Sequence, residues 1–226
     1  MHSHTPPSDR SSRPSPSLIR LDSVSVSASQ TRLLAPTSLC VDPGRIVALR
    51  GENGSGKTTL LRTLAGRTRP TSGTVTVGGV APDERDLRFR RRVAALIGPP
   101  PLAPDLTVRD HIALVSSTWE ETPDAVEAAT RQVLEEFGLT ALGTCFPHEL
   151  SSGQTQLLSL ALVFVRPFDV LLLDEPEQRL DPVRLALLAD AMRTRRAAGA
   201  TIIAATHSSS LAEATADLSV TLGETA

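Results

Sequence analysis

The sequence predicts an α/β protein built around a parallel β-sheet. Two observations carry this prediction. Short, continuous apolar runs, as expected of strands buried on both faces, alternate along the chain with helical patterns. In addition, a glycine-rich loop, Gly51–Lys57, joins the buried run Ile46–Leu49 to a helix over Thr58–Ala65, which Gly66 ends. The 226 residues suffice for one such domain, or for a core with a smaller inserted lobe.

The N-terminal part of the chain divides into a tail and a pair of strands. Residues 1–17 are rich in Ser, Pro and Arg and poor in apolar side chains, which predicts a disordered tail. His2 and His4 could chelate a metal there, but a solvated pair is the expectation. The tail has no apolar segment of the kind found in a secretory signal. Strands are then predicted at Leu18–Ser27 and Leu33–Val41, followed by a turn at residues 42–44.

The later elements follow from the same patterns. Capping signals start three helices between residues 107 and 166. Residues 85–92 hold five arginines and could form a helix; the expectation is a solvated charged face rather than a specific anion site. The predicted helix starts are Thr107 with Asp110, Thr122-Pro123, Ser151 with Gln154, and Asp181-Pro182. Further strands are predicted at Thr74–Val77, Val93–Ile97, Val170–Leu173 and Thr201–Ala205. A last helix and a last strand are predicted after His207.

Composition excludes several classes of protein. The net charge of −2 argues against a nucleic-acid binder, so no nucleic-acid partner is expected. No apolar run approaches the roughly 18 residues that a membrane span needs. Two isolated cysteines, Cys40 and Cys145, are too few for a metal cluster or a disulfide framework and are expected to be reduced core residues of a cytosolic protein.

The only lysine of the chain is Lys57, against 22 arginines. Such a bias towards arginine fits a GC-rich bacterial genome. A lysine that remains despite this bias indicates a position where a compact ammonium group is needed. The lysine lies in the pattern G-x-x-x-x-G-K-[ST], whose backbone N–H groups and lysine bind phosphates, so the chain is expected to bind a nucleoside triphosphate. Thr58 can hold a Mg²⁺ ion at the outer phosphates. The expected binding residues are Gly51, Asn53, Gly54, Ser55, Gly56, Lys57, Thr58 and Thr59.

A buried strand delivers two carboxylates to this nucleotide. Val170–Leu173 ends in Asp174 and Glu175. Asp174 would hold Mg²⁺, directly or through water, and Glu175 would polarise or orient the attacking water.

A second anion site is indicated at Ser151–Gln154. This is a helix N-terminus with exposed N–H groups and hydroxyls. The glycine-rich loop lies nearly 100 residues earlier, and this second site has no evident reason to recognise the phosphate bound by its own chain.

Together these motifs resemble the ATP-binding subunit of an ABC transporter. GENGSGKTT matches the Walker A motif of that family, LSSGQ its signature, VLLLDEP its Walker B with the catalytic glutamate, residues 178–181 its D-loop and His207 its switch histidine. The resemblance implies a P-loop NTPase with a RecA-like core, a small antiparallel β subdomain and an inserted helical subdomain at about residues 99–166. Residues 18–226 would form this single ABC ATPase domain.

The resemblance also implies a function. ATP and Mg²⁺ would bind between two chains arranged head to tail, as a homodimer or as a heterodimer with a second ABC ATPase. Lys57, Glu175 and His207 would be catalytic, and Ser151, Ser152, Gly153, Gln154 and Asp181 would contact nucleotide across the interface. The chain would hydrolyse ATP to power a separate transmembrane permease, lying in the cytoplasm against the inner face of the membrane.

Two departures from the family pattern leave alternatives open. Residues 18–44 lack the aromatic residue that stacks on adenine; Ala28 or Ser27 aligns there, and Arg20 or Arg32 could stack instead. Gly98 stands where the family has a metal-contacting glutamine. An ATP-gated dimerisation module with little turnover is therefore an alternative. A soluble ABC ATPase acting on nucleic acid or ribosomes is a third, disfavoured by the single short cassette and the absence of basic excess.

Overall fold

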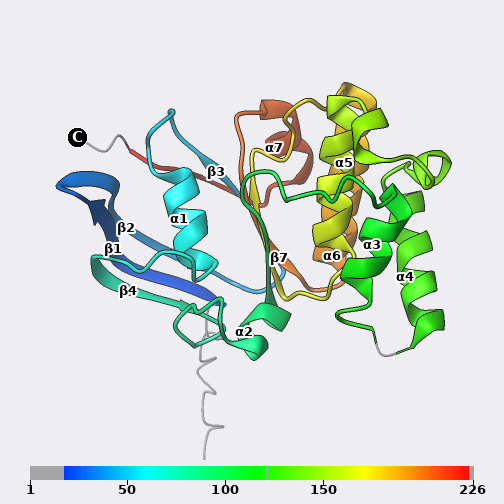
Figure 1. Ribbon diagram of the computed structural model, residues 1–226. Helices are drawn as coiled ribbons and strands as arrows, with labels where there is room; N and C mark the ends of the chain where they lie inside the picture. Colours follow the sequence, from blue (N-terminus) through cyan, green and yellow to red (C-terminus); the bar gives the residue numbers. More distant parts are fainter. Residues whose placement is uncertain (1–17, 121, 224–226) are drawn as a thin grey trace, which may run out of the picture.

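A computed structural model describes residues 18–120 and 122–223 (Figure 1). The predicted tail, with His2 and His4, lies outside these residues. The described chain forms an antiparallel and a parallel β-sheet with helices around them, so the predicted α/β class is confirmed. The antiparallel sheet has the order β2-β1-β4, with β1 at Ile19–Ala28, β2 at Thr31–Val41 and β4 at Ser72–Val77.

The parallel sheet runs through the middle of the molecule in the order β5-β6-β7-β3-β8. Its strands are short and its inner three are buried almost throughout, which is why they read as unbroken apolar runs in the sequence. They are β3 at Ile46–Arg50, β5 at Val93–Leu96, β6 at Val170–Asp174, β7 at Thr201–Ala205 and β8 at Leu218–Thr221.

The helices begin where the capping signals indicate. Thr107 with Asp110 and Ser151 with Gln154 form capping boxes, and Thr122 caps the helix that Pro123 opens. The helices are α1 at Lys57–Leu64, α2 at Leu87–Arg92, α3 at Val108–Ser116, α4 at Pro123–Glu136, α5 at Ser152–Phe164, α6 at Pro182–Ala197 and α7 at Ser209–Thr215, with 3₁₀ turns at Thr140–Leu142 and Pro147–Glu149.

Two hydrophobic cores cover the two faces of the parallel sheet. On β6, Leu171 and Leu173 pack into the core shared with α3, α4, α5 and α6. Val170 and Leu172 point the other way, into the core that α1 shares with the antiparallel sheet. Because successive side chains of a strand alternate between faces, α1 and α5 cover opposite faces of the sheet, as Figure 1 also shows.

The prediction that both cysteines lie in the core is wrong. Cys40 and Cys145 are free thiols, but Cys40 is exposed and Cys145 is half-buried. Cys40 lies on β2 between the buried residues Leu39 and Val41, so the alternation of the strand turns it outward. Within the described residues, none of the helices combines the length and the apolar character that crossing a membrane would require.

Candidate nucleotide-binding site

The glycine-rich loop follows β3 and has a backbone that only glycine adopts easily. Gly51, Gly54 and Gly56 have φ angles of 142°, 85° and 95°. A Cβ atom on Gly51 would lie 2.6 Å from Ser55 Oγ and 2.8 Å from the carbonyl oxygen of Leu222. One on Gly56 would lie 2.8 Å from the carbonyl oxygen of Leu33. The loop is therefore packed between β2 of the antiparallel sheet and Leu222, which leaves no room for a side chain at Gly51 or at Gly56.

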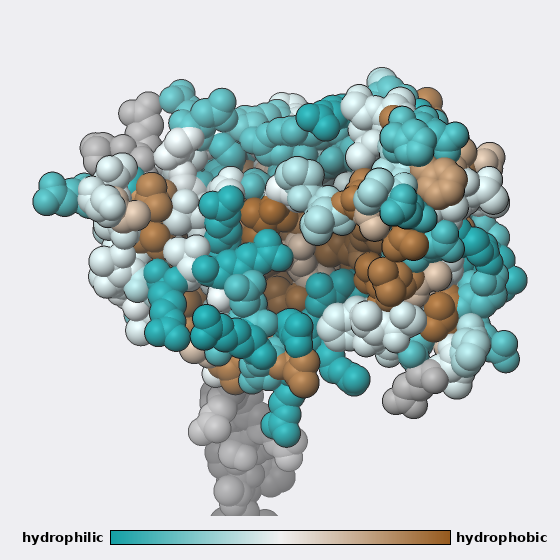
Figure 2. Space-filling view, viewed as in Figure 1, coloured by the Kyte–Doolittle hydropathy of each residue, from teal (hydrophilic) through white to brown (hydrophobic). Residues whose placement is uncertain are grey.

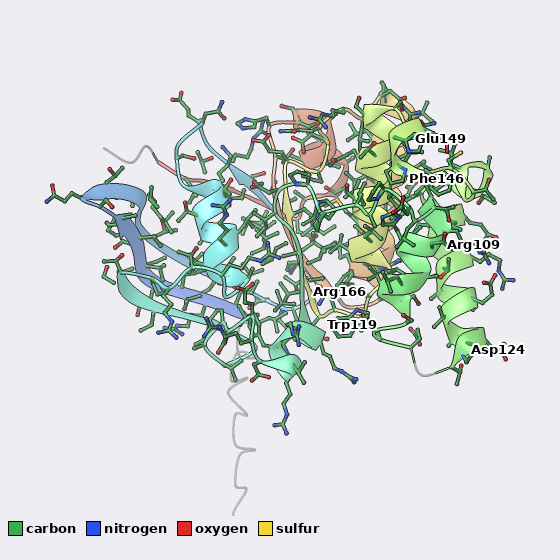
Figure 3. All side chains as sticks on the ribbon, in the orientation of Figure 1. Arg109, Trp119, Asp124, Phe146, Glu149 and Arg166 are labelled. Carbon is green, nitrogen blue, oxygen red and sulfur yellow. The ribbon has the colours of Figure 1, made fainter. Side chains whose placement is uncertain are left out.

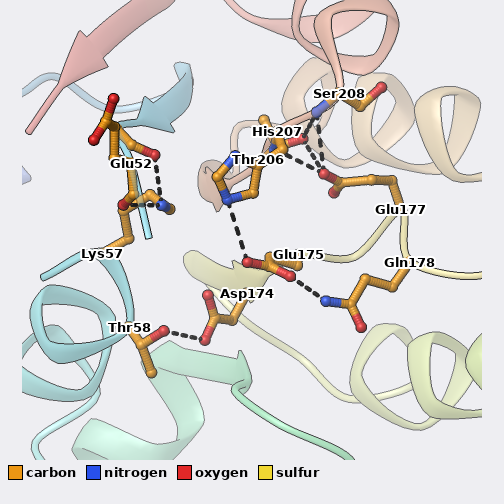
Figure 4. A network of polar contacts seen from close by, with 11 residues as sticks. Glu52, Lys57, Thr58, Asp174, Glu175, Glu177, Gln178, Thr206, His207 and Ser208 are labelled. Carbon is orange, nitrogen blue, oxygen red and sulfur yellow. Dashed lines mark hydrogen bonds and ion pairs between the residues drawn. The ribbon is translucent and has the colours of Figure 1, made fainter. Parts of the chain in front are cut away.

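Polar donors of this loop suit a phosphate. Lys57 is only 6% exposed, and its Nζ donates to the carbonyl oxygens of Gly51 at 2.7 Å and Glu52 at 2.9 Å (Figure 4). An ammonium has three N–H donors, so one remains for a phosphate oxygen. Gly56 provides no side-chain cap to α1, which leaves first-turn N–H groups available. The hydroxyl of Ser55 is buried and has no partner among the described residues.

Thr58 and Asp174 bring two hard oxygen ligands together from α1 and the end of β6. The Thr58 hydroxyl donates to Asp174 Oδ2 at 2.8 Å. Burial raises the pKa of the Asp174 carboxyl, opposed chiefly by this hydrogen bond. Oxygen donors of this kind are what Mg²⁺ prefers, and the positive charge would offset the cost of burying the carboxylate. The pair therefore fits a Mg²⁺ ion.

Glu175 and His207 face each other across the ends of β6 and β7. Glu175 Oε1 lies 3.4 Å from His207 Nε2, and the Gln178 amide donates to the other oxygen of the same carboxylate (Figure 4). The Glu175 backbone N–H also donates to the carbonyl oxygen of Ala205 at 2.8 Å. The two loops are adjacent because β6 and β7 are neighbouring parallel strands, whose carboxyl ends meet at one edge. Glu175 has a φ of 49°, an uncommon conformation that aims its side chain from a tight turn.

Glu177 is a site residue that the sequence motifs do not predict. Its Oε1 accepts hydrogen bonds from Thr206 Oγ1 at 2.6 Å, the His207 backbone N–H at 2.9 Å and the Ser208 backbone N–H at 3.2 Å. The signal available in the sequence was an acidic residue two positions after Glu175, in the loop that follows the buried strand. Glu177 thereby fixes the backbone that carries His207.

The signature residues form the first turn of α5. Ser151 Oγ accepts from the Gln154 backbone N–H at 3.3 Å, and Gln154 Oε1 accepts from the Ser151 backbone N–H at 2.7 Å. Ser152 is the first residue of the helix. A Cβ on Gly153 would lie 2.7 Å from the Arg179 carbonyl oxygen, so glycine allows α5 to contact the loop at residues 178–181.

Asp181 closes that loop. Its Oδ1 caps α6 by accepting from the Arg184 backbone N–H at 2.8 Å, and its Oδ2 pairs with the Arg184 guanidinium at 2.9 Å. In this arrangement the Asp181 carboxylate serves its own helix, while Arg179, with a φ of 64°, makes the turn before it.

Gly98 follows β5 and lies beside the two strand-end acids. It lines a small pocket of about 100 Å³ with Asp174 and Glu175, and a Cβ placed on it would meet nothing within 4 Å. The same pocket is lined by two glutamines, Gln156 and Gln178. A glutamine side chain at position 98 would therefore have space, but the φ of 76° favours glycine.

A phosphate-binding loop at the start of α1, a Thr–Asp pair and strand-end acids together define a P-loop nucleotide-binding domain. Residues 34–178 match the family model described as ABC transporter, and the chain belongs to this family as an ABC ATPase domain.

Curated relatives agree with this assignment. A putative ABC transporter ATP-binding protein of Streptomyces coelicolor is 34% identical over 213 residues, covering 94% of this chain and 38% of the relative. A putative 2-aminoethylphosphonate import ATP-binding protein of Salmonella paratyphi A is 37% identical over 165 residues, covering 72% and 44%. A Nod factor export ATP-binding protein I of Burkholderia pseudomallei is 36% identical over 170 residues, covering 75% and 56%. The chain thus spans about half the length of these relatives or less.

Solved structures share the fold. The structure of an ATP-binding subunit of an ABC transporter superposes with a TM-score of 0.81 at 28% identity, covering 91% of this chain and 85% of the other. An ATP-binding cassette in a dimeric post-hydrolysis state, bound to ADP and Pi, superposes with a TM-score of 0.80, covering 90% and 94%. At 21% identity, the second comparison speaks for the fold alone.

Proposed function

We propose that this chain binds ATP with Mg²⁺, hydrolyses ATP in a head-to-tail dimer and powers a separate membrane permease. The carrying observation is that Lys57, Thr58, Asp174, Glu175 and His207 come from distant segments and gather at one edge of the parallel sheet. Relatives named as ATP-binding proteins of transport systems support the coupling to a permease.

Each residue has a distinct role in this proposal. Lys57 and the loop N–H groups bind the outer phosphates. Thr58 and Asp174 would hold Mg²⁺, which would neutralise charge on those phosphates. Glu175 accepts a proton from the attacking water or orients it, and His207 hydrogen-bonds the γ-phosphate and holds the geometry of attack.

The two faces of the sheet support a dimer. The first turn of α5 presents N–H groups and hydroxyls suited to an anion, yet α5 and α1 cover opposite faces. A second copy, turned head to tail, would bring its Ser151 and Gly153 against the γ-phosphate held by Lys57. Ser152, Gln154 and Asp181 would support that contact from the same surface. The partner chain is either a second copy or a related ATPase.

The permease contact is proposed for the helical subdomain at about residues 99–166. Figure 2 shows hydrophobic residues gathered between the elements of the parallel sheet and the α3–α4 region. On α3, Leu114 is 57% exposed. Burying such side chains would stabilise a complex with a membrane subunit, and the chain would then lie peripherally at the cytoplasmic face of the membrane.

Gly98 favours one competing function, an ATP-gated dimerisation module with little turnover. This position provides no side chain to the metal or to the attacking water. Gln156 and Gln178 line the same pocket, and we propose that they supply the missing amide, which favours the hydrolytic function. The Gln178 amide already contacts Glu175.

Mixing two inactive variants tests the head-to-tail arrangement. Lys57→Ala destroys one half of each composite site and Ser151→Arg the other half, so each variant alone should lose turnover. A mixed dimer retains one intact site, and a one-to-one mixture should recover about a quarter of the wild-type rate for freely exchanging chains. A mixture no more active than the sum of its components, with both variants folded and binding each other, would refute the arrangement.

A further inference from the structure

Away from the nucleotide site, four arginines line one pocket. The pocket has a volume of about 430 Å³ and is formed by the end of α1, by α2 and by β5. Its charged residues are Arg67, Arg85, Arg90 and Arg166, against one acid, Glu84. Two of these arginines, Arg85 and Arg90, belong to the run at residues 85–92, for which the sequence predicts a solvated charged face. In Figure 2 the surface around α2 is mixed, with hydrophilic residues beside exposed hydrophobic ones such as Leu87, which is 67% exposed.

Arg166 is held in place before any ligand arrives. Its Nη2 donates to the carbonyl oxygens of Arg90 at 2.6 Å and Val93 at 3.3 Å. Its guanidinium carbon lies 4.7 Å from the ring centroid of Trp119 (Figure 3). These contacts fix the plane of the guanidinium, so little side-chain entropy remains to be lost on binding.

The positive charge of the pocket is poorly compensated. Glu84 pairs with Arg67 at 3.4 Å, and no salt bridge among the described residues involves Arg85 or Arg90. Arg166 Nε is buried and has no hydrogen-bond partner in the described part of the chain. Burial, together with the nearby charges of Arg90 and Arg67, lowers the pKa of the Arg166 guanidinium. Like charges that line one pocket repel one another, and a bound anion would offset that repulsion.

We propose that this pocket is a binding site for a multiply charged phosphate anion. Guanidinium groups bind phosphate oxygens in pairs, and three arginines without an acid partner match a polyphosphate or a phosphate monoester better than a single carboxylate. The volume lies within the range of small-ligand sites. The phosphate comes either from a small soluble molecule or from a lipid headgroup.

The pocket touches two elements that lead to the nucleotide site. Ala65 follows the last residue of α1, the helix that begins at Lys57. Val93 begins β5, the strand that ends just before Gly98. An anion here is therefore distinct from the nucleotide phosphates, although both sites are joined by rigid elements.

Titration calorimetry of the full chain with sodium tripolyphosphate tests the proposal. Lys57→Ala serves as the background, because the nucleotide loop also binds phosphates. Arg85→Ser with Arg90→Ser should weaken binding at least about tenfold, since two charge-assisted contacts are lost. The matched control is Arg88→Ser with Arg91→Ser, which removes the same charge from α2 outside the pocket and should change the affinity less than about twofold.

A second arm distinguishes the phosphate sources. Phosphatidylcholine vesicles with phosphatidic acid should bind in an Arg85- and Arg90-dependent way if the source is a headgroup, and not if it is a soluble anion. If the Arg85/Arg90 and Arg88/Arg91 double variants weaken tripolyphosphate binding equally, the binding reflects non-specific electrostatic attraction to α2, and the proposal is overturned. A polyglutamate peptide binding more tightly than tripolyphosphate would also overturn it, in favour of an acidic protein segment.

Discussion

The backbone N–H of His207 donates to the carboxylate of Glu177 at 2.9 Å, and Thr206 and Ser208 donate to the same oxygen. One carboxylate therefore holds three consecutive residues of the loop that presents His207 toward Glu175. The loop after β6 thus positions the loop after β7, and the placement of His207 depends on Glu177.

Replacing Glu177 should slow turnover without abolishing nucleotide binding. Glu177→Ala removes all three acceptor contacts, and misplacing His207 by about 1 Å should lower kcat roughly 10–100-fold. Glu177→Gln keeps one acceptor oxygen and should lie between wild type and Glu177→Ala. The Kd for ATP should stay within about threefold, since the glycine-rich loop is untouched. Glu213→Ala, at an exposed carboxylate on α7, is the control, and an equal loss there would contradict the positioning role.

An aromatic residue at position 28 should tighten ATP binding. Ala28 ends β1 in the hairpin whose second strand lies against Gly56. Stacking of the base on a tyrosine there would contribute about 1–3 kcal/mol, so Ala28→Tyr should lower the Kd for ATP by roughly 5–150-fold. Ala28→Leu adds apolar area without a ring and should give a smaller change. Equal effects of the two variants in fluorescence titrations would show that stacking is not what the chain lacks.

Because the wild-type chain lacks an aromatic residue to stack on adenine, we expect it to bind ATP weakly and to discriminate poorly between ATP and GTP. A Kd comparable to that of a relative with the aromatic residue would refute this expectation. If Arg20 or Arg32 stacks on the base instead, replacing that arginine by alanine should weaken binding further.

Gly98→Gln separates backbone strain from side-chain chemistry. The φ of 76° should cost about 1 kcal/mol of stability for any side chain, so Gly98→Gln and Gly98→Ala should both unfold at lower denaturant concentration than wild type. If an amide at this position supports hydrolysis, Gly98→Gln should turn over ATP several-fold faster than Gly98→Ala. Identical rates for the two variants would indicate that Gln156 and Gln178 already supply the amide.

The capping box of α3 should give a pH-dependent contribution to stability. Asp110 Oδ2 accepts from the Thr107 hydroxyl at 2.6 Å and from the Thr107 backbone N–H at 3.0 Å, and these bonds hold the Asp110 pKa below its ordinary value of 3.8. A carboxyl with a lowered pKa stabilises the fold above its ordinary pKa, and this contribution is lost as the pH falls through the folded value. Asp110→Asn should therefore unfold more easily than wild type at pH 7.

The difference between Asp110→Asn and wild type should shrink as urea unfolding is repeated below about pH 4. Asp105→Asn, at an exposed carboxylate just before α3, is the control. An offset that stays constant with pH would mean that the charge of Asp110 is not what stabilises the cap.

Much of this fold could be predicted because local signals and tertiary structure agree. The helix starts at Thr107, Thr122 and Ser151 are read from side chains that bond to their own backbone, and the buried strands from apolar runs without alternation. Cysteine is usually a buried residue type, but the alternation of β2 turns Cys40 outward, and this alternation decides its exposure.

The parts that escaped prediction depend on contacts between distant segments. Glu177 acts on a loop about 30 residues later in the chain, and nothing local to either segment indicates the pairing. The arginine pocket needs Arg67 and Arg166, far from the run at residues 85–92, and only the packing of α1, α2 and β5 brings them together.

The most direct test of the proposed function is ATP turnover measured across a range of chain concentrations, for wild type and Glu175→Gln. A dimeric ATPase predicts a rate that rises faster than linearly with chain concentration and disappears in Glu175→Gln. A rate strictly proportional to concentration, or one that survives the substitution, would contradict the composite site built on Glu175. No turnover in wild type despite bound ATP would contradict autonomous hydrolysis and favour the ATP-gated module.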